Sequence, residues 1–231
     1  MTTPRRAVLF DLDGTLIDSH PLMTRCFTDT LLPHLPRRVE DPATLAGLFL
    51  RQLGLPLDVI FLTALQTLGH SPESAVRLAP ALCATYRRHM TEIDQALQPF
   101  PGIPEALAAL RDRGVRMAVV TTKHAYLAHR HLRSLRLAKF FSAIITGDQC
   151  QRCKPDPLPL HLALSALKVR PEEAVAVGDT PGDVAAAKAA GVLAAAATWG
   201  AADPAALLSA GPDRVLTDPA QLLALDLLDN A

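Results

Sequence analysis

The 231-residue sequence has few cysteines, few aromatic residues and no excess of either charge. Its 4 cysteines are too few for a disulfide scaffold and are compatible with a reducing compartment. Because 23 basic residues balance 23 acidic ones, nothing indicates a nucleic acid or an anionic membrane as a partner. An aromatic content of 4% also argues against base-stacking platforms for single-stranded nucleic acid.

Long hydrophobic runs are missing as well. No stretch approaches the roughly 18 uncharged apolar residues that a membrane helix needs. After Arg5-Arg6 the apolar run covers only Ala7 to Phe10, which is shorter than the hydrophobic core of a secretory signal, roughly 7–15 residues. We therefore expect a cytoplasmic protein. With 49% apolar and 20% charged residues, the chain has the composition of a globular protein that buries a core unaided.

Short apolar runs recur along the chain, and each is bounded by polar turn residues. Such runs are typical of strands that are buried on both faces, as in parallel sheets. Segments 104–113 and 181–190 have Pro in the first turn and Gly just past the end, which predicts helices. The alternation predicts an α/β fold with a Rossmann-like parallel sheet. The expected strands are Ala7–Phe10, Val115–Thr121, Ala143–Thr146, Ala174–Val177 and Val192–Ala197.

The interval from Ser19 to Leu97 breaks this alternation, because it contains helical patterns and no convincing strand. Asp41-Pro42 and Ser71-Pro72 have the composition of helix starts. Pro80 is expected to kink or split the last helix of the interval. The sequence therefore predicts an all-helical cap inserted into an α/β core. The core is expected to comprise residues 1–17 and 98–231, and the cap residues 18–97.

Two aspartates, Asp11 and Asp13, directly follow the first expected strand. Open α/β sheets bind their ligands at the carboxyl ends of the strands. In extended backbone the two side chains share a face, and their like charges favour a bound cation or a raised pKa. The alternative, a surface turn with two solvated carboxylates, is weakened by the apolar strand before them.

A second acidic pair follows the strand expected at 174–177. Asp179 lies at the end of that strand, and Asp183 lies in the first turn of the next helix. There the charge of Asp183 could equally serve the helix dipole. Four carboxylates with little nitrogen or sulfur nearby suit a hard, oxygen-binding cation, most often Mg²⁺.

Hydroxyl and ammonium groups follow two other expected strands. Thr121 and Thr122 stand where the second strand closes, and Lys154 follows the third strand after a short loop. Together these groups could hold phosphoryl oxygens beside a metal ion. Each residue alone is ordinary at its position, so the prediction depends on their order and shared location.

Two further groups are interpreted as ordinary residues. Cys150 and Cys153 form a CxxC pair, but a zinc site needs about four ligands and no second pair exists. His124, His129 and His131 lie on an expected helix with spacings that fit no metal set. We therefore expect loop thiols and exposed histidines.

Taken together, these segments resemble the motifs of haloacid-dehalogenase-superfamily hydrolases with a helical cap after the first strand. Within that branch the chain is most similar to phosphoglycolate-phosphatase-like members, although Thr122 stands where those members often have Asn. Asp13 argues against a dehalogenase, and the absence of lysine from 19–97 excludes a Schiff-base phosphonatase. The four motifs are Phe10-Asp11-Leu12-Asp13-Gly14-Thr15-Leu16, Val120-Thr121, Lys154-Pro155 and Gly178-Asp179-Thr180-Pro181-Gly182-Asp183.

The resemblance implies a role for each residue. Asp11 would be the nucleophile that forms an aspartyl-phosphate, and Asp13 the general acid and then base. Thr121, Thr122 and Lys154 would bind the phosphoryl group. The metal, Mg²⁺, would be held by Asp11, Asp179 and the backbone carbonyl of Asp13, with Asp183 in support.

The resemblance therefore implies a Mg²⁺-dependent phosphatase for a small phosphorylated metabolite, with 2-phosphoglycolate as the first candidate. Pyrophosphate or another small phosphoester, a sugar phosphomutase reaction, and a non-enzymatic binding role are the alternatives. From the cap, Arg51 at the end of segment 42–51 is predicted to contact the anionic substrate, and a solvated helix-end arginine is the alternative. The sequence makes no prediction of the oligomeric state.

Overall fold

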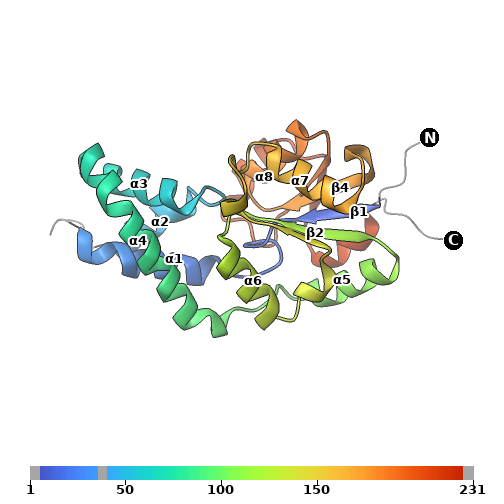
Figure 1. Cartoon of the computed structure of the whole chain (residues 1–231), viewed down its shortest axis with the longest axis horizontal. Helices are drawn as coiled ribbons and strands as arrows, with labels where there is room; N and C mark the ends of the chain where they lie inside the picture. Colours follow the sequence, from blue (N-terminus) through green and yellow to red (C-terminus); the bar gives the residue numbers. More distant parts are fainter. Residues whose placement is uncertain (1–5, 36–40, 226–231) are drawn as a thin grey trace.

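The computed structural model describes residues 6–35 and 41–225 of the chain. Figure 1 shows a sheet covered by helices, with a separate group of helices to one side. The parts of the predicted domains that fall on 1–5, 36–40 and 226–231 lie outside the described residues.

The core is built on one sheet of parallel strands in the order β3-β2-β1-β4-β5-β6. The Rossmann-like α/β prediction is therefore correct, and each of the five expected strands is present. β6 was not expected from the sequence, because it is a short edge strand in which only Leu216 is buried. The bounds are β1 Ala7–Phe10, β2 Arg116–Val120, β3 Ala143–Ile145, β4 Ala174–Gly178, β5 Leu193–Ala197 and β6 Arg214–Leu216.

Helices cover both faces of the sheet, because alternate strand residues are apolar on both sides. Val8 and Phe10 face one hydrophobic cluster, to which α5 and α6 contribute. Ala7 and Leu9 face a second cluster, formed with α7, α8 and α9. The bounds are α5 Ile103–Asp112, α6 Ala125–Ser134, α7 Leu158–Leu167, α8 Pro181–Ala189 and α9 Pro204–Ser209.

The cap helices are α1 His20–Leu31, α2 Pro42–Leu50, α3 Leu57–Thr67 and α4 Pro72–Ile93. They bury a hydrophobic cluster of their own, in which the Phe27 ring lies 4.9 Å from Phe49 and 5.1 Å from Phe61. The expected split at Pro80 does not occur, since α4 runs through it. Pro80 is exposed, so water can satisfy the carbonyl left without its helical hydrogen bond.

The two connections between core and cap lie side by side. The amide of Asp18 donates to the carbonyl of Gln98 at 3.0 Å, and the amide of Phe100 donates to the carbonyl of Leu16 at 3.1 Å. This pairing places the cap at the carboxyl ends of β1 and its neighbours. No helix in 6–35 or 41–225 combines the length and apolar character needed to cross a bilayer.

Candidate active site

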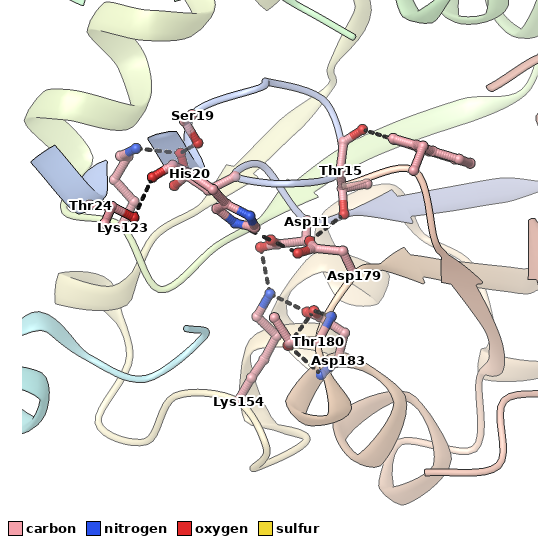
Figure 2. A network of polar contacts seen from close by, with 12 residues as sticks. Asp11, Thr15, Ser19, His20, Thr24, Lys123, Lys154, Asp179, Thr180 and Asp183 are labelled. Atoms are coloured by element: carbon pink, nitrogen blue, oxygen red, sulfur yellow. Dashed lines mark hydrogen bonds and ion pairs between the residues drawn. The ribbon is translucent and has the colours of Figure 1, made fainter. Parts of the chain in front are cut away.

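Four charged residues predicted from the sequence meet at the carboxyl edge of the sheet: Asp11, Lys154, Asp179 and Asp183 (Figure 2). Asp11 follows β1 and Asp179 follows β4, and these two strands are neighbours. Asp183 joins them from the first turn of α8. Each of the three offers a carboxylate oxygen, and these oxygens lie within 4.8 Å of one another. The strand order therefore explains how residues far apart in sequence form one acidic cluster.

Lys154 holds this cluster together. Its Nζ lies 2.6 Å from Oδ1 of Asp11, 2.5 Å from Oδ1 of Asp183 and 2.9 Å from the carbonyl of Val120. Burial alone would lower the pKa of Lys154, but the charges of Asp11 and Asp183 outweigh burial and raise it. The ammonium is therefore a fixed positive charge among the carboxylates.

The single positive charge of Lys154 does not offset the negative charge of all the carboxylates around it. Burial, together with the charges of Asp183 and Asp13, raises the pKa of Asp11 to about 7 against the opposing effect of Lys154. Burial and the charges of Asp11 and Asp183 raise the pKa of Asp179 well above its usual value. Both shifts mean that the cluster is short of positive charge.

The residues fit a hard divalent cation such as Mg²⁺. Oδ1 of Asp179 accepts a hydrogen bond from the Thr15 hydroxyl at 2.8 Å, whereas its buried Oδ2 has no hydrogen-bond partner. An unpartnered oxygen beside two other carboxylates is the donor set that Mg²⁺ prefers. Nε2 of His20 lies 3.7 Å from this Oδ2.

Asp183 has two functions in the structure. The Thr180 amide and hydroxyl donate to its Oδ2 at 3.0 and 2.6 Å, while its own amide donates to the Thr180 hydroxyl at 3.3 Å. This reciprocal cap begins α8 and leaves Oδ1 free for Lys154. Asp183 therefore caps α8 and contacts Lys154 at the same time, while its support of a metal ion stays a prediction.

Asp13 has partners of its own. Nζ of Lys123 lies 2.5 Å from its Oδ1, and the Ser19 hydroxyl donates to the same oxygen at 2.6 Å. Burial alone would raise the pKa of Asp13, but Lys123 and Ser19 hold it below its usual value. Lys123 was not among the site residues predicted from the sequence. Its position just past the end of β2, at the same sheet edge, was the available signal.

The turn after β1 has room only for glycine at position 14. A Cβ on Gly14 would lie 2.2 Å from Oδ2 of Asp179 and 2.3 Å from the His20 ring, and its φ of +81° is left-handed. Nε1 of Trp199 donates to the carbonyl of Thr15 at 3.0 Å and fixes the turn from the other side. His20, which sequence reasoning also missed, therefore packs directly against the acidic cluster.

The remaining predicted site residues divide into two groups. Thr121 is buried at the site, where its Oγ1 accepts a hydrogen bond from the Lys123 amide at 3.1 Å. Thr122 lines a pocket beside Asp13. Arg51 is exposed, does not line that pocket, and extends its guanidinium back along α2 toward Gly47. The structure thus brings both threonines to the site but not Arg51, and the substrate contact predicted for Arg51 stays a prediction.

The expectation that the histidines of α6 are exposed is wrong for His131. Its side chain is fully buried, neither ring nitrogen has a hydrogen-bond partner, and burial lowers its pKa to about 4. The cause is helix phase, because His131 lies on the same face as the buried Leu127, Ala128 and Leu132. His124 and His129 are half-buried. Cys150 and Cys153 are free, half-buried thiols whose pKa values are raised by burial.

The pocket beside Asp13 has a volume of about 510 Å³ and lies between the core and the cap helices. Its core side is formed by Asp13, Thr122, Lys123 and residues of the loops that follow β2 and β3. Its cap side comes from α1, the α2–α3 turn, α3 and α4. Asp13, which is predicted to transfer protons, therefore opens onto a space between the core and the cap.

Comparison with known proteins gives the family of the chain. Residues 8–197 match the family model described as haloacid dehalogenase-like hydrolase. The chain is 34% identical to the pyrophosphatase PpaX of Listeria monocytogenes, over 97% of this chain and 98% of that protein. It is 35% identical to a plasmid-encoded phosphoglycolate phosphatase of Cupriavidus necator, over 97% and 94%.

A solved structure confirms the fold. The structure of a predicted phosphoglycolate phosphatase from Haemophilus somnus covers 97% of this chain and 99% of its own, with a TM-score of 0.83 at 23% identity. At this identity the likeness concerns the fold alone, including both the sheet and the helices inserted after β1.

Proposed function

Since the chain belongs to the haloacid dehalogenase-like hydrolases and is a phosphatase of that family, we propose that it hydrolyses phosphate monoesters of small metabolites in two steps. Asp11 and Asp13 carry out the chemistry. The observation that supports this most strongly is the arrangement of two separate carboxylate–lysine pairs, Asp11 with Lys154 and Asp13 with Lys123, at one sheet edge.

In the first step, an Oδ of Asp11 attacks phosphorus and forms an aspartyl-phosphate, while the bond from phosphorus to the leaving oxygen breaks. Lys154 keeps the carboxylate of Asp11 oriented. Thr121 accepts from the Lys123 amide, so its hydroxyl hydrogen is available to a phosphoryl oxygen. These contacts position the transferring group, which is the main task of a protein in phosphoryl transfer.

Asp13 gives its proton to the leaving alkoxide and, in the second step, takes a proton from the water that hydrolyses the aspartyl-phosphate. In the resting structure Lys123 and Ser19 favour the ionised form of Asp13. An arriving phosphate dianion would attract Lys123 and raise the pKa of Asp13. Substrate binding itself would then favour protonated Asp13, the form that the first step needs.

Mg²⁺ would be held by Asp11, Asp179 and the backbone carbonyl of Asp13, with Asp183 in support. When bound, it neutralises phosphoryl oxygens, so that an anionic nucleophile can approach. The support for this is the buried, unpartnered Oδ2 of Asp179 within a cluster of three carboxylates.

The relatives name the first substrates to assay. 2-Phosphoglycolate is the first candidate, because phosphoglycolate phosphatase is among the similar proteins, and pyrophosphate is the alternative, because PpaX is another. A phosphomutase would use the same aspartates and return the phosphoryl group to a sugar. The cytoplasmic setting favoured by the sequence is part of the proposal.

The test is an assay of phosphate release by the purified protein with Mg²⁺ from a panel of phosphorylated metabolites, with an acid quench to trap radiolabelled phosphoenzyme. We expect free phosphate and a labelled protein that Asp11→Asn does not form. Isomerised sugar phosphate without phosphate release would identify a mutase. Neither phosphate release nor phosphoenzyme with any compound would overturn the proposal.

A further inference from the structure

The pocket between the core and the cap is the place for the alcohol part of the substrate. Its core side is formed by Asp13, Thr122 and Lys123. In the proposed function Asp13 protonates the leaving oxygen, so the group attached to that oxygen must lie in the space onto which Asp13 opens. The lining of this pocket therefore describes the leaving group.

The lining is mainly apolar, and most of it comes from the cap. α4 runs along one side of the pocket and contributes one apolar side chain per turn or more. A pocket of about 510 Å³ also lies within the range of about 300–1,000 Å³ that holds drug-sized ligands. The apolar side chains that face it include Met23, Leu62, Val76, Ala79, Tyr86 and Leu127.

The charges around the pocket nearly cancel. Lys123 is paired with Asp13, and Nε2 of His124 lies 3.5 Å from Oδ2 of Asp148. Asp58 and Arg87 remain, one of each sign. A second phosphate or a short carboxylate close to the reacting phosphorus would need an excess of positive charge at this end, and the described lining has none.

Arg87 is the cap cation that the pocket does offer. It is half-buried on α4, and in the part of the chain that the structure describes its side chain has no hydrogen bond or ion pair. Guanidinium groups that lose water at a pocket wall are stabilised by an oxygen acceptor, preferably an anionic one. Arg87 therefore marks where a polar end of the substrate would bind.

The relatives' names rank 2-phosphoglycolate and pyrophosphate first, but the pocket lining favours another class. We propose that the enzyme prefers, over those two compounds, phosphate monoesters whose alcohol part is extended and mainly apolar and carries an anionic or hydrogen-bond-accepting group for Arg87. This inference rests on the proposed function and specifies its substrate class. The apolar wall binds the body of the alcohol, and Arg87 binds its far end.

The experiment compares kcat/KM with Mg²⁺ for n-alkyl phosphates from methyl to hexyl, alongside pyrophosphate and 2-phosphoglycolate. The alcohols of this series leave almost equally well, so only binding changes along it. We expect kcat/KM to rise about two- to fourfold for each methylene that enters the pocket. A flat or falling series, or faster turnover of pyrophosphate or 2-phosphoglycolate than of the longer esters, would overturn the inference.

A second arm tests Arg87. Each alkyl phosphate is paired with an ester of the same length that ends in a carboxylate, and the ratio of the two kcat/KM values is measured. Wild type should favour the carboxylate form, and Arg87→Met should lower that ratio about tenfold or more. The matched control is Arg88→Met on the next residue of α4, whose exposed side chain pairs with Glu92 at 3.9 Å and should leave the ratio unchanged. An unchanged ratio in Arg87→Met contradicts the assignment.

A third arm tests the apolar wall. Val76 lines the pocket and is 62% exposed, so Val76→Asp should fold. The variant should lower the ratio of hexyl to methyl phosphate turnover about tenfold, because a carboxylate then faces the alkyl chain. An unchanged ratio would contradict the claim that the apolar lining binds the alkyl chain.

The two proposals fail in different ways. If p-nitrophenyl phosphate and methyl phosphate are hydrolysed and phosphoenzyme is trapped, but neither chain length nor Arg87 matters, only the substrate class is wrong. If no ester is hydrolysed and no phosphoenzyme forms, the proposed function fails, and this inference fails with it.

Discussion

The core side and the cap side of the active site are built on opposite principles. On the core side, charged groups are held by charged or hydroxyl partners, as Lys154 holds Asp11 and Asp183 and Lys123 holds Asp13. On the cap side the pocket is mainly apolar, and Arg87 has no such partner within 6–35 and 41–225. The core is thus organised without a ligand, whereas the cap offers an apolar surface and the half-buried guanidinium of Arg87.

This difference separates chemistry from selectivity. Fixed hydrogen bonds and ion pairs orient groups for a reaction at no further cost when it occurs. Apolar walls select by size and shape and contribute little to the bond-breaking step. Core variants should therefore change turnover of every ester, whereas cap variants should change the ranking of esters.

The largest expected effect comes from Asp11→Asn. The amide is nearly isosteric but a poor nucleophile, so kcat should fall at least about 10⁴-fold for all substrates, good and poor leaving groups alike. Phosphate release and phosphoenzyme trapping measure it, and circular dichroism checks the fold. Near-wild-type turnover by a folded variant would refute the covalent mechanism. The chemistry could then no longer be assigned to the carboxylates of the core.

Asp13→Asn should have the next largest effect, and its size should depend on the leaving group. A general acid contributes about 10²–10⁴-fold, so alkyl phosphates should lose in that range while p-nitrophenyl phosphate, whose leaving group needs little protonation, loses less in the first step. Rates over a leaving-group series give the slope. Equal losses across the series would contradict the acid role of Asp13.

The core side could be predicted from the sequence because each of its residues directly follows a recognisable strand or the loop after one. Asp11, Lys154 and Asp179 follow apolar strands, and a parallel sheet aligns those strand ends. The cap side could not be predicted in the same way, since the sequence does not show which face of a helix meets a neighbour. Arg51 was the cap cation expected to contact substrate, whereas Arg87, which lines the pocket, was not singled out. His131 was expected to be exposed, but the phase of α6 buries it on the same face as Leu127 and Leu132.

A third prediction concerns stability. Burial and like charges raise the pKa of Asp179 in the folded protein, so the folded state binds this proton more tightly than the unfolded state does. The resulting contribution to stability is fully present when the pH is below about 4, the pKa of an aspartate in the unfolded chain. That contribution is lost as the pH rises toward the folded pKa. At pH 7 and without metal, Asp179→Asn should therefore raise the free energy of unfolding by roughly 1 kcal/mol, or about 2–4 °C in Tm.

Thermal unfolding in a chelator measures this change, with Asp112→Asn, an exposed carboxylate on α5, as the control that should change little. Added Mg²⁺ should raise the Tm of wild type, because a ligand that binds only the folded state stabilises it. It should not raise the Tm of Asp179→Asn. If Asp179→Asn were less stable than wild type in the chelator, the carboxylate cluster would not be short of positive charge.

The smallest expected effect is that of Arg51→Ala, and it decides which cap cation matters. As the structure places it, Arg51 is exposed and lies outside the pocket lining, so KM should change less than about twofold, as for an ordinary surface substitution. Arg87→Met, measured in parallel on the carboxylated esters, should show the larger loss. If Arg51→Ala instead raised KM for those esters while sparing p-nitrophenyl phosphate, the contact predicted from the sequence would be the correct one. The cap would then have to move Arg51 toward Asp13 during turnover, and the apolar pocket would describe an open form rather than the one that selects the substrate.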